Sequence, residues 1–266
     1  VVVCDLSLLK DTVDLPFSFF LKDFQIIKLD NRDEAMVGEN NLCVSENYIL
    51  VYGSVYELHP CRLFTKKGEF VTNIGAIGQG PGEYRAVYKA EIDEKHNCIY
   101  LMPFANSNAI YVYDLAGKPL RSIPLHQSVS KAVFKVDADK RELTVGALPF
   151  TGYPFVAWVQ DFEGHLLDSV PAARHLSVLP DYSNEVMYGA NTEVFDLYIS
   201  TFFELRPDTL YHYIRSESRL KPRFTLNIGD RKRSITTFYE LPQAYVGRLM
   251  VEEQVSLSLI HISEPP

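Results

Sequence analysis

The chain has 266 residues, of which 47% are hydrophobic and 23% charged, so it is long and apolar enough to bury a core. Its 26 basic and 34 acidic residues leave a net charge of −8, which argues against a nucleic-acid partner and gives no attraction to an anionic membrane surface. No run of 18 apolar residues is present, so we predict no transmembrane helix.

The chain opens with VVVCDLSLLK, which lacks a starting Met and the basic leader of a signal peptide. We therefore expect it to begin inside a longer reading frame or as a processed product. Cys4 is a candidate for a lipid anchor in the full-length protein, although Val3 stands where a lipoprotein signal has a small residue. Within this lead, residues 1–40, the segment Phe24–Leu29 is predicted as a strand.

The four cysteines show neither a CxxC pair nor the spacing of a zinc site. We expect free, buried thiols at Cys4, Cys43, Cys61 and Cys98. A Cys43–Cys61 bridge stays open as an alternative in an oxidising compartment.

Three segments repeat one pattern around a turn: CRLFTKKGEFVTNI, AIYVYDLAGKPLRSI and FVAWVQDFEGHLLDSV. Their turns end at Gly68, Gly117 and Gly164, which are 49 and 47 residues apart. Thr or Asp opens each turn and Gly closes it, which is typical of a type I turn. Because apolar residues recur at matched offsets from the glycine, each segment is predicted as a β-hairpin.

A second strand pair is predicted upstream of each hairpin: NLCVS with YILVYGS, VYKAEID with CIYLMPF, and KAVFKVD with ELTVGAL. A fourth, weaker unit, TLYHYIRSESRLKPRFTLNI, has no turn glycine, and Glu217 falls near that position. Four short antiparallel strands in a repeat of about 45 to 50 residues are typical of a β-propeller blade. Residues 41–256 are therefore predicted as a partial β-propeller. A single sandwich is the alternative, but it would not predict the even spacing. The sequence of Leu241–Val255 is compatible with either a helix or a blade strand.

The glycine-rich stretch IGAIGQGPGEYR, residues 74–85, falls between the first two units. A phosphate-binding loop would need Gly-Lys-Ser/Thr opening a helix, and here no Lys follows while Pro81 removes a donor. We predict an interblade connector instead, in which glycines permit tight turns and Pro81 stiffens the bend. The structural turn residues are Gly68, Gly78, Gly80, Pro81, Gly82, Gly117 and Gly164. The alternative is a ligand or partner loop made of Gln79, Glu83, Tyr84 and Arg85.

No chemical motif points to catalysis. The histidines form no HxH or HxxxH pair, although a propeller can assemble metal ligands from several blades. No GxSxG element is present, and Asp114 and Asp161 are interpreted as turn residues because they recur at the first turn position. We predict no catalytic residue, no metal ligand and no cofactor.

The element GQGPGEY after a repeat hairpin, together with IYVYDLAGK at residues 110–118 and PDTLY at residues 207–211, resembles a six-bladed β-propeller family of lipoproteins and cell-envelope proteins from Bacteroidota. The family usually carries Arg where this chain has Gln79. The resemblance covers about Asp23–Ile228 and implies an all-β fold with about four to five of six blades present. It also implies an N-terminal strand that closes the ring, and a location in the periplasm or outer cell envelope.

The last residues, 257–266, are predicted to be foreign. Leu257–Pro265 resembles the translation of a transposon adapter used to prepare sequencing libraries, so genuine sequence is expected to stop near Ser256. The alternative is a real strand with Leu257, Leu259 and Ile262 on one face.

Taken together, these patterns predict a non-enzymatic binding or scaffolding module of an envelope protein, with a protein, peptide or glycan as partner. The alternative is a propeller-type lyase or hydrolase with a site at the central channel.

Overall fold

The computed structural model describes residues 1–8, 16, 18, 21–38, 41–53, 59–173, 176–189, 192–201, 208–227, 234–242, 244–251 and 254–260. Strands dominate these residues, and their helical turns are short 3₁₀ segments: η1 (Leu6–Leu8), η3 (Asp33–Ala35) and η4 (Arg215–Glu217). No α-helix occurs in the described part, and no helix there is long and apolar enough to cross a membrane. The all-β prediction is confirmed.

Four sheets have the predicted blade order, with each strand hydrogen-bonded to the next in sequence. The first blade comprises β2 (Asn41–Val44), β3 (Tyr48–Tyr52), β4 (Cys61–Thr65) and β5 (Phe70–Ile74). The second comprises β8 (Val87–Asp93), β9 (Cys98–Pro103), β10 (Ser107–Tyr113) and β11 (Ile123–Val129). The third comprises β12 (Ala132–Asp137), β13 (Glu142–Ala147), β14 (Phe155–Asp161) and β15 (Leu166–Pro171). The fourth comprises β16 (Glu185–Met187), β17 (Asp196–Ser200), β18 (Asp208–Ile214) and β19 (Arg219–Asn227).

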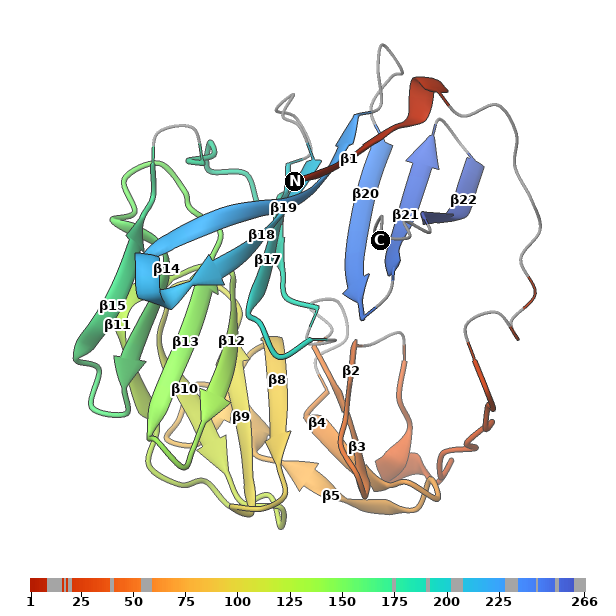
Figure 1. Cartoon of the computed structure of the whole chain (residues 1–266). Coiled ribbons are helices and arrows are strands. Elements are labelled where there is room, and N and C mark those ends of the chain that lie inside the picture. The colour runs from red at the N-terminus through yellow and green to blue at the C-terminus, as the bar shows by residue number, and fades with distance from the viewer. Residues whose placement is uncertain are drawn as a thin grey trace.

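A fifth sheet has three strands, β20 (Ser234–Leu241), β21 (Ala244–Val251) and β22 (Gln254–Ile260). Figure 1 shows the five sheets following one another round an arc, from orange β2–β5 through yellow and green to blue β20–β22. The first strands of neighbouring blades contact one another, β2 with β8, β8 with β12 and β12 with β16, so they lie on the inside of the arc. This arrangement is a β-propeller fold with four blades and a partial fifth.

The core lies between successive blades. One apolar cluster joins the first two blades, a second joins the second and third, and a third joins the third and fourth. Middle strands such as β9 and β14 are therefore covered on both faces, and they are buried along nearly their whole length. This explains why their sequences, CIYLM and VAWV, are continuous apolar runs rather than alternating ones.

The predicted turn glycines have the backbone that the type I pattern requires. Gly68, Gly117 and Gly164 have φ of +87°, +83° and +90°, where a side chain is strained. Glycine has a second role here, because a Cβ on Gly117 would lie 2.2 Å from the Asn73 carbonyl oxygen of the preceding blade. In the fourth blade Ser218, not Glu217, takes the left-handed position, with φ +46°, and its hydroxyl donates to Asp168.

The predicted strand Phe24–Leu29 is wrong, because these residues have no sheet partner. They run instead beside the first blade, where the Asp30 N–H donates to the carbonyl of the turn residue Gly68 (2.8 Å). The next blade has an equivalent bond, from the Gly75 N–H to the carbonyl of the turn residue Gly117 (3.3 Å). The apolar side chains Ile27 and Leu29 pack on the first blade, which accounts for the strand-like pattern. The N-terminal strand is β1 (Val2–Asp5), which pairs parallel with β19. Closure of the ring by the lead stays a prediction.

Two segments for which the sequence allowed alternative predictions lie in or next to the fifth sheet. Leu241–Val255 is not a helix, because its described residues belong to β20–β22 and the turns between them. Part of the predicted adapter tail, Leu257–Ile260, pairs with β21, which agrees with the strand alternative. The adapter origin of the tail stays a prediction, and residues 261–266 lie outside the described part. All four cysteines are free thiols, with Cys61 buried and the other three half-buried.

Candidate functional site

The glycine-rich stretch runs from the outer strand β5 to the inner strand β8. Two short strands, β6 (Ala76–Ile77) and β7 (Glu83–Tyr84), pair parallel and close the loop between them. Gly80 N–H donates to Glu83 Oε2 (2.8 Å), and Glu83 N–H donates to the Gly80 carbonyl (3.1 Å). The Glu83 side chain therefore folds back over the glycines, and a Cβ on Gly78 would lie 1.9 Å from its carboxylate.

Tyr84 locks this connector onto the first blade. Its ring is only 3% exposed, its hydroxyl accepts from Cys61 N–H (2.7 Å) and it donates to the Ile74 carbonyl. Burial raises the pKa of Tyr84 above its ordinary value. The side chain predicted for a ligand loop is thus a core anchor, whereas Gln79 and Arg85 are exposed.

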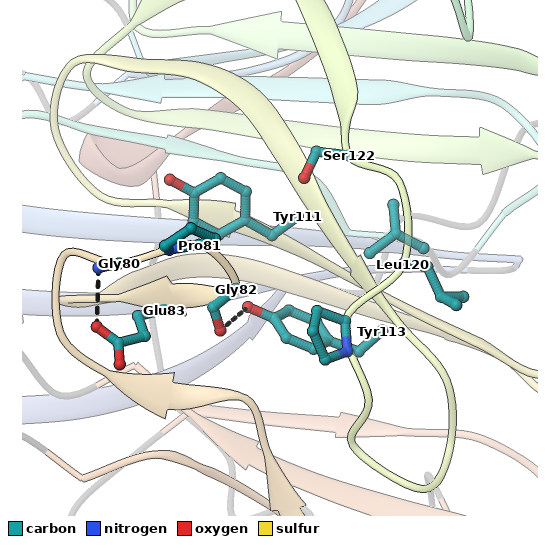
Figure 2. Close-up of a pocket in the computed structure, with 10 residues that line it drawn as sticks. Gly80, Pro81, Gly82, Glu83, Tyr111, Tyr113, Leu120 and Ser122 are labelled. Carbon is teal, nitrogen blue, oxygen red and sulfur yellow. Dashed lines mark hydrogen bonds between the residues drawn. The ribbon is translucent and has the colours of Figure 1, made fainter.

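Beside the connector lies a cavity of about 400 Å³. The connector supplies Gly80–Glu83, strand β10 supplies Tyr111–Tyr113, and the following turn supplies Pro119, Leu120 and Ser122. Figure 2 shows how the Tyr113 hydroxyl, which donates to the Gly82 carbonyl (3.2 Å), ties the two walls together. Of the four residues predicted for a ligand loop, only Glu83 lines this cavity.

The repeat explains why the cavity exists. The residue six positions before each turn glycine faces backward, toward the preceding blade or the lead. In the third blade this residue is Trp158, which is 0% exposed and donates to Gln160 Oε1 (2.9 Å). In the first blade it is Arg62, also buried, which donates to the carbonyls of Glu34 and Met36. In the second blade it is Tyr111, which stays half-buried and leaves the cavity beside it.

The lining suits an apolar group with a polar edge. Pro81, Pro119 and Leu120 give apolar walls. Within the described part of the chain, no hydrogen bond is found for the hydroxyls of Tyr111 and Ser122. A concave site that combines apolar walls with a few polar groups is the usual form of a small binding site. Sequence reasoning missed Tyr111, Leu120 and Ser122, because only the comparison of backward-facing positions in three blades would have indicated them.

Three histidines in the described residues, His96, His165 and His212, lie beside carboxylates, whereas His126 Nδ1 lies 3.2 Å from the Gly164 carbonyl oxygen. His96 Nδ1 lies 2.7 Å from Asp93, and His165 Nδ1 lies 2.8 Å from Asp161, both at turns. No group of three or more metal-ligating side chains occurs within the described ranges.

One inner-strand carboxylate has an unusual environment. Glu91 of β8 accepts from Val136 N–H of β12 (3.2 Å). Burial raises its pKa from 4.5 to about 7. A charged residue in the inner strand VYKAEID was the only signal for it in the sequence.

A family model described as "Domain of unknown function (DUF4934)" matches residues 1–252. The chain belongs to this DUF4934 family. No curated protein matches the chain. A solved structure described as a "Putative exported protein" from Bacteroides fragilis is 17% identical, with a TM-score of 0.62 over 90% of this chain and 73% of that one. The WD40 repeats of RRP9 are 9% identical, with a TM-score of 0.37 over 76% of this chain and 69% of that one. The likeness to the Bacteroides structure shows that this DUF4934 chain shares its fold.

Proposed function

We propose that the chain is a non-enzymatic binding module of a bacterial envelope protein, and that the connector cavity holds an apolar side chain of a partner protein or peptide. The observation that carries this proposal is the cavity itself. The same backward-facing position is filled in the first and third blades and left open in the second.

The walls support binding because they are held in place before any partner arrives. Tyr84 and Tyr113 each bond to backbone carbonyls across the connector. A preorganised site loses little conformational entropy when it binds. Burying one Leu-sized side chain contributes about 1.5–3 kcal/mol, which is too little for a stable complex alone. Exposed Gln79 and Arg85 at the connector are placed to add polar contacts around the anchor.

The envelope location rests on two supports. The GQGPGEY element and the hairpins resemble the six-bladed lipoprotein family of Bacteroidota. The similar Bacteroides fragilis protein is described as exported. We infer a periplasmic or outer-envelope location for the full-length protein, with six blades in its complete ring.

A selection of peptides displayed on phage tests the binding proposal. Leu120→Asp places a charge on the cavity wall, where Leu120 is 44% exposed. The matched control is Leu167→Asp, because Leu167 occupies the same repeat position after Gly164 and is 47% exposed. Peptides enriched on the wild type should lose at least about tenfold in affinity on Leu120→Asp. Equal losses in both variants, or none in either, would contradict a site at the connector.

The lyase or hydrolase alternative is favoured by one observation, Glu91 on the inner strand β8 with a pKa of about 7, since a general base works best near the operating pH. A screen of polysaccharide substrates tests it, with Glu91→Gln as the inactive control. Turnover that survives this substitution would exclude Glu91 as the base.

A further inference from the structure

A second candidate site lies where the second, third and fourth blades meet. Five aromatic side chains form a connected group, in which Tyr88 contacts Phe104. We call the other four the aromatic platform: Phe104, Phe150, Tyr153 and Tyr182. Tyr182 is at its centre, with ring centroids 6.0 Å from Phe104 and 5.7 Å from Phe150 in edge-on contacts. Its side chain is nevertheless half exposed, at 50%. An aromatic ring that is held on two sides and open on the third is a ready surface for a ligand.

A buried lysine holds the backbone of Tyr182 in place. Lys131 Nζ donates to the carbonyls of Tyr182 (2.7 Å) and Asn184 (2.9 Å) and pairs with the Glu185 carboxylate. It also lies 5.8 Å from the centre of the Phe104 ring. Its charge is thus fully engaged by the protein. Lys131 therefore positions the Tyr182 backbone and is not itself offered to a ligand.

Backbone strain is concentrated at the same place. Ala105 and Asn106, which follow Phe104, have consecutive positive φ angles of 64° and 49°. Alanine has no side-chain hydrogen bond to offset this conformation. The turn is kept by Ala105 N–H, which donates to the Ser130 carbonyl (2.8 Å). Such strain persists where the surrounding structure holds it, and it gathers at binding sites. This turn directly follows Phe104, whose ring contacts Tyr182.

The polar edge of the platform is made of hydroxyls. Tyr182 donates to Ser130 Oγ at 3.3 Å, and Ser130 Oγ lies 3.3 Å from the Tyr153 hydroxyl. Both distances exceed the 2.7–2.8 Å that such bonds favour, so ligand hydroxyls can replace them at little loss. The nearby Asp181 carboxylate is engaged by Ser183. The platform therefore presents the half-exposed ring of Tyr182, backed by the buried Phe150, with neutral hydroxyls at its edge.

We propose that the aromatic platform binds a neutral sugar ring of a glycan. A pyranose presents C–H groups to an aromatic face and hydroxyls to hydroxyl partners, and it needs no charged contact. A charged peptide or an anionic polymer is disfavoured, because Lys131 and Glu185 already pair with each other and Asp181 already accepts from Ser183. This site is separate from the connector cavity and does not depend on it.

An array of neutral oligosaccharides probes the site, and titration calorimetry then measures the strongest binder. Tyr182→Ala should weaken that binding by about tenfold or more, since stacking and a hydroxyl are both lost. Tyr182→Phe keeps the ring and should lose only about two- to threefold. The matched control is Tyr239→Ala, because Tyr239 on β20 is 43% exposed and lies outside the platform.

Leu120→Asp, which alters the connector cavity, should bind the sugar with wild-type affinity. The glycan proposal and the peptide proposal can therefore fail independently of each other. Absence of binding across the neutral array would overturn the proposal, as would equal affinity in Tyr182→Ala and the wild type. Binding of an uncharged peptide that Tyr182→Ala abolishes, with no sugar bound, would assign the platform to proteins instead.

Discussion

The junction between the first and second blades differs from the junction between the second and third, although one repeat builds both. In the second junction β11 reaches β12 through only Ser130 and Lys131, and Trp158 fills the space between the blades. In the first junction residues 75–86 connect β5 to β8, and Tyr111 leaves a cavity. The difference indicates that the repeat packs neighbouring blades closely and that a cavity forms where the second blade departs from this pattern.

The largest expected effect comes from removing the side chain that fills the junction between the second and third blades. Trp158→Ala removes a fully buried ring and leaves Gln160 without its indole donor, so we expect a loss of about 3–5 kcal/mol in the free energy of unfolding. Tyr111→Ala at the equivalent position of the second blade should lose less, about 1.5 kcal/mol, because that side chain is only partly buried. Urea unfolding of both variants measures the difference, and similar losses would contradict it.

Turn glycines give a smaller effect. Gly117→Ala strains a φ of +83° and places a Cβ 2.2 Å from the Asn73 carbonyl of the first blade, so we expect a loss of about 2–4 kcal/mol. The control is Gly152→Ala, where φ is +97° but a Cβ meets nothing within 4 Å. This control should lose only about 1 kcal/mol, from strain alone. If thermal unfolding gives equal losses, the close approach between blades is not what requires glycine.

Glu91 of the second blade accepts a hydrogen bond from the third blade, and we expect its ionisation to make the free energy of unfolding depend on pH. Its pKa is about 7 in the fold against an ordinary 4.5, so the folded state binds the extra proton between these values and loses stability as pH rises through them. Glu91→Gln keeps an acceptor for Val136 N–H and removes this loss. The variant should exceed the wild type by about 1–2 kcal/mol near pH 8 and match it near pH 4.5. A pH-independent difference in unfolding free energy would contradict burial of an ionisable group here.

Much of the fold could be predicted from local signals. Turn glycines at even spacing indicated the blades, and continuous apolar runs marked the middle strands. The strand predicted at Phe24–Leu29 is wrong because packing of Ile27 and Leu29 on the first blade gives the same alternation of apolar residues as a strand. The cavity could not be foreseen, because its walls come from residues 80–83 and 111–122 and depend on how far Tyr111 fills a space. The burial of Tyr84 likewise depends on bonds to Cys61 and Ile74 of the first blade.

The connector cavity is most directly tested by filling it. Tyr111→Trp gives the second blade the residue that fills the equivalent position of the third. The selected peptides should then lose at least about tenfold in affinity, while the free energy of unfolding stays within about 1 kcal/mol of the wild type. Tyr111→Phe, which keeps the open space, should still bind. If Tyr111→Trp folds normally and binds the peptides as the wild type does, the cavity is not the binding site.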